Sequence, residues 1–218
     1  MNMESMDLYA GLMHELKNNL GLLAMTIDGI PVTGQPEHDH RVDEARLLCQ
    51  RVIDRLQQAL LIYKARHQSI TPLVDAYSPR DLAEELRDTA NSLARGRLHV
   101  DVQFADGVPE IWFFDRNLVE MAMINAIHNA LGYAKNLIRI GVSLQEGMLD
   151  ISVWDDSGGY PQHVLQAFAD RQPYRATGTG LGLQFAKLVA EAHEDRGKVG
   201  ELRLSNQDGG ALFSLRLP

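Results

Sequence analysis

Two polar clusters inside helical patterns carry side chains that could take part in phosphoryl chemistry. His14 lies about 200° around a helix from Leu12 and Leu16, so its imidazole is expected to face away from the apolar stripe. The neighbouring Glu15 could fix one tautomer and leave the other ring nitrogen as a nucleophile, and Asn18 lies one turn later on the same face. An ordinary polar residue on a helix surface is the other interpretation of His14.

The second cluster is a pair of asparagines, Asn125 and Asn129, inside an otherwise apolar helical pattern. A spacing of four places both amides on one face, and Asn is a poor residue for a helix interior unless its amide is used. Amide oxygens suit Mg²⁺, which keeps several waters and takes phosphate oxygens as its other ligands. A polar stripe or a hydrogen bond between helices explains the pair equally well.

Two glycine-containing segments complete the candidate chemistry. Residues 155–161 (Asp-Asp-Ser-Gly-Gly-Tyr-Pro) end a predicted strand, and residues 177–183 (Thr-Gly-Thr-Gly-Leu-Gly-Leu) open a predicted helix. Closely spaced glycines before a helix let backbone N–H groups surround a phosphate at the positive end of the helix dipole. The second run lacks the P-loop lysine and follows a polar loop, so neither common nucleotide fold fits. A flexible loop is the alternative for either segment alone.

The first third of the sequence predicts a helical hairpin that would carry the histidine. Apolar residues from Leu12 recur at three- and four-residue steps until Gly29, and a second stripe begins after Asp39, a suitable N-cap. Proline and glycine between the stripes end the first helix. Because a lone hairpin has too small a core, we expect residues 1–70 to form a four-helix bundle with a second copy, as a homodimer.

The remaining two thirds of the sequence mix strand and helix patterns. Residues 71–79 are expected to be a linker that leads into a helix capped by Ser78, and residues 80–218 are expected to be the second domain. The alternation of apolar residues predicts strands at 98–104, 111–114, 138–144, 148–154, 202–205 and 212–217, and helices at 118–134 and 181–193. Strands mixed with helices indicate an α+β domain.

Composition restricts the class of function. A net charge of -8 over 218 residues argues against nucleic acid as the main partner. The single cysteine, Cys49, cannot form an internal disulfide, which favours a reducing compartment. The longest apolar run, residues 20–27, is far shorter than the roughly 20 residues that a membrane span needs, and the first residues lack a basic signal-peptide segment. We therefore expect a cytoplasmic protein with no membrane span in this chain.

Taken in order, the four motifs resemble the core of bacterial sensor histidine kinases over nearly the whole chain. Residues 14–18 look like the H-box, 125–133 like the N-box, 155–159 like the G1 box and 178–182 like the G2 box. The resemblance implies a dimerisation and phosphotransfer hairpin followed by a GHKL-type (Bergerat-type) α/β sandwich that binds ATP. It also implies a two-component system, in which the response-regulator receiver domain is the partner.

For the hairpin, the resemblance implies a protein-histidine kinase site. His14 would be autophosphorylated and would pass its phosphoryl group to the aspartate of the response regulator. Glu15 would be the general base, and Asn18 would orient water for dephosphorylation of that aspartate, so the chain would also be a phosphatase of its regulator. Because only thirteen residues precede His14, either a separate sensor protein delivers the signal in trans or the chain is a fragment of a longer kinase.

For the second domain, the resemblance implies a site for ATP and Mg²⁺. Asn129 would hold the metal with Asn125 nearby, Tyr133 would pack against the base, and Asp155 would accept a hydrogen bond from the adenine amino group. Gly178, Gly180 and Gly182, with their backbone, would surround the phosphates. The full set of expected cofactor-binding residues in the G1 box, the lid and the G2 box is Gly159, Arg175, Gly178, Thr179, Gly180, Leu181 and Gly182. Arg175, like Arg171, is equally well interpreted as a solvated surface arginine.

Several departures from the family pattern bear on ATP turnover. Asn19 replaces a frequent proline in the H-box, Ser157 replaces the first G1 glycine, and Gly132 replaces a frequent lysine before Tyr133. The lid, residues 162–177, is short and lacks its usual tandem glycine. Each change could lower ATP affinity or turnover without abolishing it.

Three alternative functions stay open. The first is a histidine phosphotransferase or phosphatase hub whose ATP-binding domain is weak or inactive, as Ser157 and Gly132 would suggest. The second is an ATP-binding regulatory module like the anti-sigma-factor serine kinases, for which His14 would be dispensable. The third is a metal site at residues 37–40 (Glu-His-Asp-His), although polar clusters are usual where a loop meets a helix.

Overall fold

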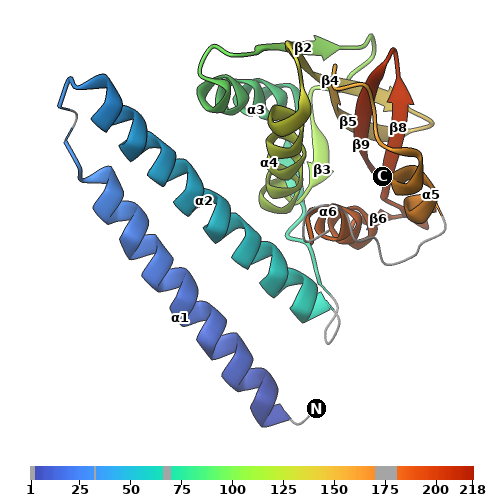
Figure 1. The fold of residues 1–218 in the computed structure, drawn as a ribbon. Coiled ribbons are helices and arrows are strands. Elements are labelled where there is room, and N and C mark those ends of the chain that lie inside the picture. Colours follow the sequence, from blue (N-terminus) through green and yellow to red (C-terminus); the bar gives the residue numbers. More distant parts are fainter. Residues whose placement is uncertain (1–2, 32, 66–69, 170–180) are drawn as a thin grey trace. The chain divides into compact units, whose positions relative to one another are not determined.

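The computed structural model describes residues 3–31, 33–65, 70–169 and 181–218, which belong to two compact units (Figure 1). The units are Met1–Ser69 and Ile70–Pro218. Within the described ranges, no helix combines the length and the hydropathy that crossing a bilayer requires.

The first unit is a hairpin of two long helices, α1 (Met3–Asp28) and α2 (Pro36–Ala65), which pack against each other. The first helix ends next to Gly29, as predicted. The prediction that Asp39 is the N-cap of the second helix is wrong, because α2 begins at Pro36 and Asp39 lies in its first turn. The Asp39 carboxylate instead closes the loop by accepting hydrogen bonds from the backbone N–H groups of Thr33 (2.9 Å) and Gly34 (3.0 Å).

The hairpin buries little by itself. Among its described side chains, those that are buried are Cys49, Gln58 and Ile62. Large apolar side chains on both helices are exposed in the single chain, and Met25 is 72% exposed; the others are Leu16, Leu22, Leu23, Leu48 and Val52.

The second unit is built on a five-stranded sheet with the strand order β2-β4-β5-β9-β8. The strands are β2 (His99–Phe104), β4 (Leu137–Gln145), β5 (Met148–Asp155), β8 (Glu201–Gln207) and β9 (Gly210–Leu217). The first pair, β2 with β4, is parallel, and the other pairs are antiparallel. Two short ribbons flank the sheet, β1 (Asp75–Tyr77) with β3 (Trp112–Phe114) and β6 (Glu194–Asp195) with β7 (Lys198–Val199).

Three helices, α3 (Pro79–Ala94), α4 (Arg116–Tyr133) and α6 (Leu181–Ala192), cover one face of this sheet (Figure 1). Local capping explains where two of them begin. The hydroxyl of Ser78 accepts a hydrogen bond from the Asp81 amide at 3.2 Å, as the sequence predicts, and the Asp115 carboxylate accepts one from the Leu118 amide at 3.0 Å. A further helix, α5 (Gln162–Ala169), occupies the start of the segment that was expected to be a lid.

The core lies between the sheet and these helices. Alternate residues of the strands face the helices, for example Ile138 and Ile140 of β4 and Leu149 and Ile151 of β5, and all four are fully buried. The helices contribute Leu82, Leu86, Met123, Ile127 and Phe185. The predicted α+β architecture is thus confirmed for the second unit, whereas the strand β1 inside the expected linker 71–79 was not foreseen.

Candidate functional site

The N-box and G2 segments meet where α4 passes the start of α6. Gly182 is the second residue of α6, and a Cβ built on it would overlap the side-chain amide of Asn125. This close approach explains the third glycine of the G2 run, because a larger residue would overlap the Asn125 amide in its present position. The sequence analysis had assigned both residues to one site, and the structure brings them into contact.

The amide of Asn125 has an unused hydrogen-bond donor. Its Nδ2 atom is buried and has no partner among the residues that the structure describes. A buried donor without a partner is costly unless a ligand or water uses it. Because this amide touches the amino-terminal end of α6, where backbone N–H groups are also unsatisfied, the pair fits an anionic ligand such as a phosphate.

The G1 turn begins with the buried carboxyl group of Asp155, at the end of β5. Its Oδ1 accepts a hydrogen bond from the Ser157 amide at 2.9 Å. Burial raises the pKa of Asp155, and hydrogen bonds from Ser157 only partly oppose this. The Ser157 hydroxyl also accepts a hydrogen bond from the Gly159 amide at 3.3 Å, so the serine that departs from the family pattern stabilises the turn.

Gly159 is held by a residue that the sequence analysis did not identify. Asn206, on β8, accepts a hydrogen bond from the Tyr160 amide at 2.6 Å and donates one to the Tyr160 carbonyl at 2.9 Å. A Cβ on Gly159 would meet the Asn206 side chain at 2.6 Å, and Gly159 has a φ of 98°, so glycine is required on both grounds. Burial, and then the nearby Asp155 charge, raise the pKa of the Tyr160 phenol.

Asp156 ties the end of α4 to the end of β5. Its carboxylate accepts hydrogen bonds from the backbone amides of Lys135 (2.7 Å) and Asn136 (3.0 Å), which follow the C-cap residue of the helix, Ala134. Burial opposes ionisation, but these amides and that of Leu137 together lower the pKa of Asp156. These hydrogen bonds hold the carboxyl-terminal turns of α4 beside the G1 turn.

The remaining N-box residues on these turns are open to solvent. Asn129 is exposed, and Tyr133 is 68% exposed. A hydrated Mg²⁺ needs such access, because it gives up its water ligands reluctantly. The donor set of the site, two asparagine amides and a helix start, therefore fits a metal-bound polyphosphate.

The other predicted site residues fall in two groups. Residues 14–18 lie on α1, where Glu15 and Asn18 are exposed; the His14 side chain lies outside the described part of the structure. The predicted phosphate-binding residues Arg175, Gly178, Thr179 and Gly180 also lie outside the described residues.

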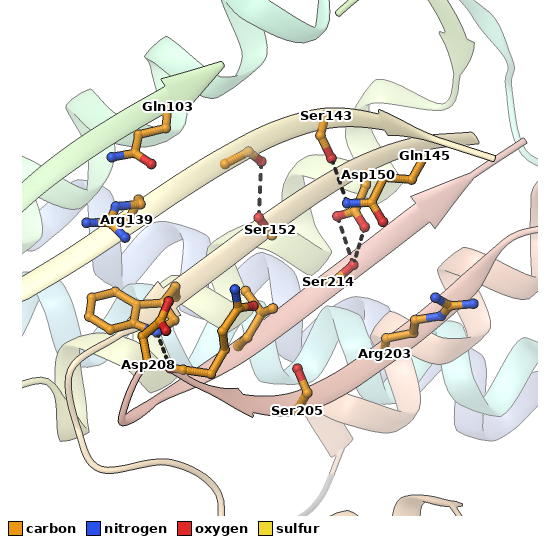
Figure 2. A pocket seen from close by; sticks show the side chains of 14 residues that line it. Gln103, Arg139, Ser143, Gln145, Asp150, Ser152, Arg203, Ser205, Asp208 and Ser214 are labelled. Carbon is orange, nitrogen blue, oxygen red and sulfur yellow. Dashed lines mark hydrogen bonds between the residues drawn. The ribbon is translucent and has the colours of Figure 1, made fainter. Parts of the chain in front are cut away.

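Two further features are separate from this site. In the described ranges, no group of three His, Cys, Asp or Glu side chains could hold a metal ion, so the structure offers no support for a metal site at 37–40. The outer face of the sheet carries a polar hollow of about 410 Å³, in which Ser214 donates a hydrogen bond to Asp150 and Arg139 lies 5.0 Å from the Trp154 ring (Figure 2).

Comparison with known proteins finds a family match within the second unit. Residues 114–218 match the family described as histidine kinase-, DNA gyrase B-, and HSP90-like ATPase. The chain is similar to the sensor-like histidine kinase SenX3 of Mycolicibacterium smegmatis, with 24% identity over 97% of this chain and 57% of that protein. It is also similar to the sensor protein kinase CarS of Pseudomonas aeruginosa, with 30% identity over 94% of this chain and 44% of that protein. The chain thus spans about half the length of these two relatives.

Solved structures show the same fold. Full-length ShkA in complex with AMPPNP matches 97% of this chain and 45% of its own chain, with a TM-score of 0.70 and 19% identity. The histidine kinase AdeS of Acinetobacter baumannii matches 94% of this chain and 96% of its own, with a TM-score of 0.60 and 18% identity. The chain is therefore similar over nearly its whole length to the cores of bacterial sensor histidine kinases, and its residues 114–218 match the ATP-binding domain of the histidine kinase-, DNA gyrase B-, and HSP90-like ATPase family.

Proposed function

We propose that this chain is an ATP-dependent protein-histidine kinase, which autophosphorylates His14 and transfers the phosphoryl group to an aspartate of a response-regulator receiver domain. The contact between Asn125 and Gly182 carries the proposal, because it joins the N-box to the G2 segment and leaves a buried donor for phosphate. The helical hairpin that bears His14 supplies the acceptor.

In this proposal the chain binds adenine at the G1 turn. Asp155 accepts a hydrogen bond from the adenine amino group on the side of the carboxylate that Ser157 leaves open. The exposed Tyr133 ring packs against the base. Backbone N–H groups of residues 178–182, with the Asn125 amide, surround the phosphates, and Arg175 extends toward the γ-phosphate.

Asn129 is the proposed protein ligand of Mg²⁺, which neutralises phosphate charge when bound. Positioning and charge neutralisation are the main demands of phosphoryl transfer, and both come from groups on α4 and at the start of α6. The His14 ring nitrogen forms the new bond to the γ-phosphorus while the bond to the bridging oxygen breaks and ADP leaves. Glu15 takes the proton from the other ring nitrogen, and Asn18 orients water during dephosphorylation of the regulator.

We further propose that the hairpin dimerises as a four-helix bundle. Its exposed apolar side chains, with Leu23 on α1 and Val52 on α2 among them, would then be covered by the same surface of a second copy. A cytoplasmic location and a sensor protein acting in trans belong to the same proposal.

The test is incubation of the purified chain with γ-labelled ATP and Mg²⁺. We expect acid-labile, alkali-stable label on the parent and none on His14→Gln or Asn129→Ala. The matched controls are His99→Gln, on the surface of β2, and Asn117→Ala, in the exposed first turn of α4, and both should label like the parent. Label that survives in His14→Gln would overturn the assignment of the hairpin.

The phosphotransfer hub is the alternative function. It is favoured by Gly132, an exposed glycine at the position where related kinases often have a lysine that would contact phosphate. A folded parent that takes no label from ATP, but accepts phosphate at His14 from a phosphorylated receiver domain, would favour the hub over the kinase.

A further inference from the structure

The far end of the α4–α6 helix pair contains a buried polar junction that the proposed chemistry does not use. His193, 2% exposed, follows α6, and Asp115, 7% exposed, caps α4. The backbone N–H of Asp115 donates to His193 Nε2 at 2.9 Å, and His193 Nδ1 donates to the Val189 carbonyl at 2.7 Å. Both ring nitrogens are therefore used by a neutral imidazole with its proton on Nδ1, and burial lowers the pKa of His193 accordingly.

This junction lies at the opposite end of the pair from the phosphate-binding contact. The helices pack in opposite directions, so that Asp115 meets His193 at one end and Asn125 meets Gly182 at the other. At 1.5 Å per residue, the rise is about 15 Å from Asp115 to Asn125 and about 16 Å from Gly182 to His193. Because the two spans match, the hydrogen bond between Asp115 and His193 sets the register in which Asn125 meets Gly182.

The same carboxylate also holds the chain that enters the second unit. Asp115 Oδ1 accepts the capping bond from Leu118, and Oδ2 accepts a bond from the Leu73 amide at 2.8 Å. Leu73 lies three residues after the start of this unit at Ile70. Asp115 thus contacts the entering chain and the N-box helix through its carboxylate, and it contacts His193, the residue that follows α6, through its backbone N–H.

We propose that Asp115 and His193 are positioning residues, which set the register of α4 against α6 and thereby the nucleotide affinity of the Asn125–Gly182 contact, and that Leu73 links the entering chain to this register. The inference rests on the proposed nucleotide site. A shift of either helix by one residue, about 1.5 Å, would break the Asn125–Gly182 contact, which has no room for even a methyl group.

The first experiment measures the affinity of the full chain for a fluorescent ATP analogue with Mg²⁺. His193→Leu removes both hydrogen bonds, and we expect a loss of affinity of about tenfold or more. His193→Gln keeps one donor and one acceptor, so it should stay within about threefold of the parent. Val100→Ala, a core change on the edge strand β2, is the control for a general loss of stability. An unchanged affinity in His193→Leu, or an equal loss in Val100→Ala at the same Tm, would overturn the proposal.

The second experiment is a double-mutant cycle on the Leu73 bond. Asp115→Asn keeps one oxygen for the helix cap but turns an NH₂ group toward the Leu73 N–H. Leu73→Pro removes that backbone N–H at a residue that is 81% exposed. Each single variant should lower nucleotide affinity about threefold. The double variant should lose no more affinity than either single variant, because both substitutions remove the same hydrogen bond between Leu73 and Asp115. Fully additive losses would show that the bond does not link the two residues.

A third measurement separates this inference from the proposed function. Hydrogen exchange of the full chain without nucleotide reports on residues 181–186 and 122–127 directly. We expect His193→Leu to accelerate exchange in both segments and Val100→Ala, at the same Tm, to leave them as in the parent. If the parent binds no nucleotide, the proposed function fails while exchange still tests the junction, and unchanged exchange in His193→Leu rejects it.

Discussion

At the scale of single residues, Asp155 is the side chain on which base recognition would depend in the proposed function. One oxygen of its buried carboxylate accepts from the Ser157 amide, so a ligand amino group needs the other. The amide of Asp155→Asn has only one oxygen, so it cannot accept hydrogen bonds from both the Ser157 amide and the ligand amino group. Losing a buried acceptor costs about 1–3 kcal/mol, which corresponds to a loss of at least about fivefold in ATP affinity.

We therefore expect Asp155→Asn to weaken ATP binding by about tenfold in calorimetric titration, and to weaken GTP binding less, because guanine has a carbonyl where adenine has the amino group. Asp106→Asn, in an exposed turn, should bind like the parent. An Asp155→Asn chain with parental ATP affinity would show that the G1 turn does not read the base.

His193 makes the folding stability of the second unit depend on pH. Burial lowers the pKa of the folded imidazole below its ordinary value of about 6.5, so on acidification the unfolded chain binds this proton first. The stability that neutral His193 contributes is complete above about pH 6.5 and is lost as the pH falls below it.

We expect urea unfolding to show a larger loss of stability between about pH 7.5 and 5.5 in the parent than in His193→Gln, since glutamine does not titrate. His99→Gln, an exposed histidine on β2, should follow the parent. Parallel profiles for His193→Gln and the parent would contradict the pKa direction.

The sequence identifies candidate functional residues, but it does not identify the residues that hold them in position. Asn125, Asn129 and Asp155 were identifiable from residue type and spacing, because amides in a helix interior and a carboxylate before a glycine turn are unusual. Asn206 and His193 were not, because each acts on a partner that is distant along the chain, 46 and 78 residues away. Only the folded sheet and helix pair bring such residues together.

At the scale of elements, the α4–α6 pair predicts opposite effects for the same substitution at two glycines. In Gly182→Ala the new methyl group would overlap Asn125, and overpacking of this kind costs about 1–3 kcal/mol. In Gly132→Ala nothing lies within 4 Å of the new Cβ, and an exposed helical glycine replaced by alanine gains about 0.5–1 kcal/mol.

Thermal unfolding with and without Mg²⁺ and ATP measures both changes. Gly182→Ala should lower the Tm and weaken nucleotide binding by about tenfold or more, and Gly132→Ala should raise the Tm and bind nucleotide like the parent. A Gly182→Ala chain with parental stability and affinity would mean that the helices do not approach as closely as the structure shows.

The elements that the sequence predicts well are those with long periodic patterns. The sheet strands alternate because one face is buried, and the hairpin helices carry a continuous stripe. The strand β1 was missed because its stability comes from pairing with β3, where Tyr77 packs against Phe114 with ring centroids 5.5 Å apart. The early start of α2 was missed because Asp39 resembles an N-cap in the sequence, whereas its carboxylate accepts hydrogen bonds from Thr33 and Gly34 in the preceding loop.

At the scale of the whole molecule, the proposed kinase needs two copies of the hairpin. A single hairpin leaves large apolar side chains in water on both helices, and Leu23 and Val52 are about half exposed. Burying a glutamate in an apolar interface is strongly unfavourable, so Leu23→Glu with Val52→Glu should separate the copies.

We expect light scattering to give a dimer mass for the parent and a monomer mass for the Leu23→Glu, Val52→Glu variant. Label on His14 should fall by more than about tenfold in the variant, while nucleotide affinity, a property of the second unit, stays within about twofold of the parent. Arg55→Glu, a charge change at an exposed position of α2, should remain a dimer. A parent that is a monomer yet labels His14 would show that autophosphorylation needs only one copy, and that the apolar stripes serve another partner.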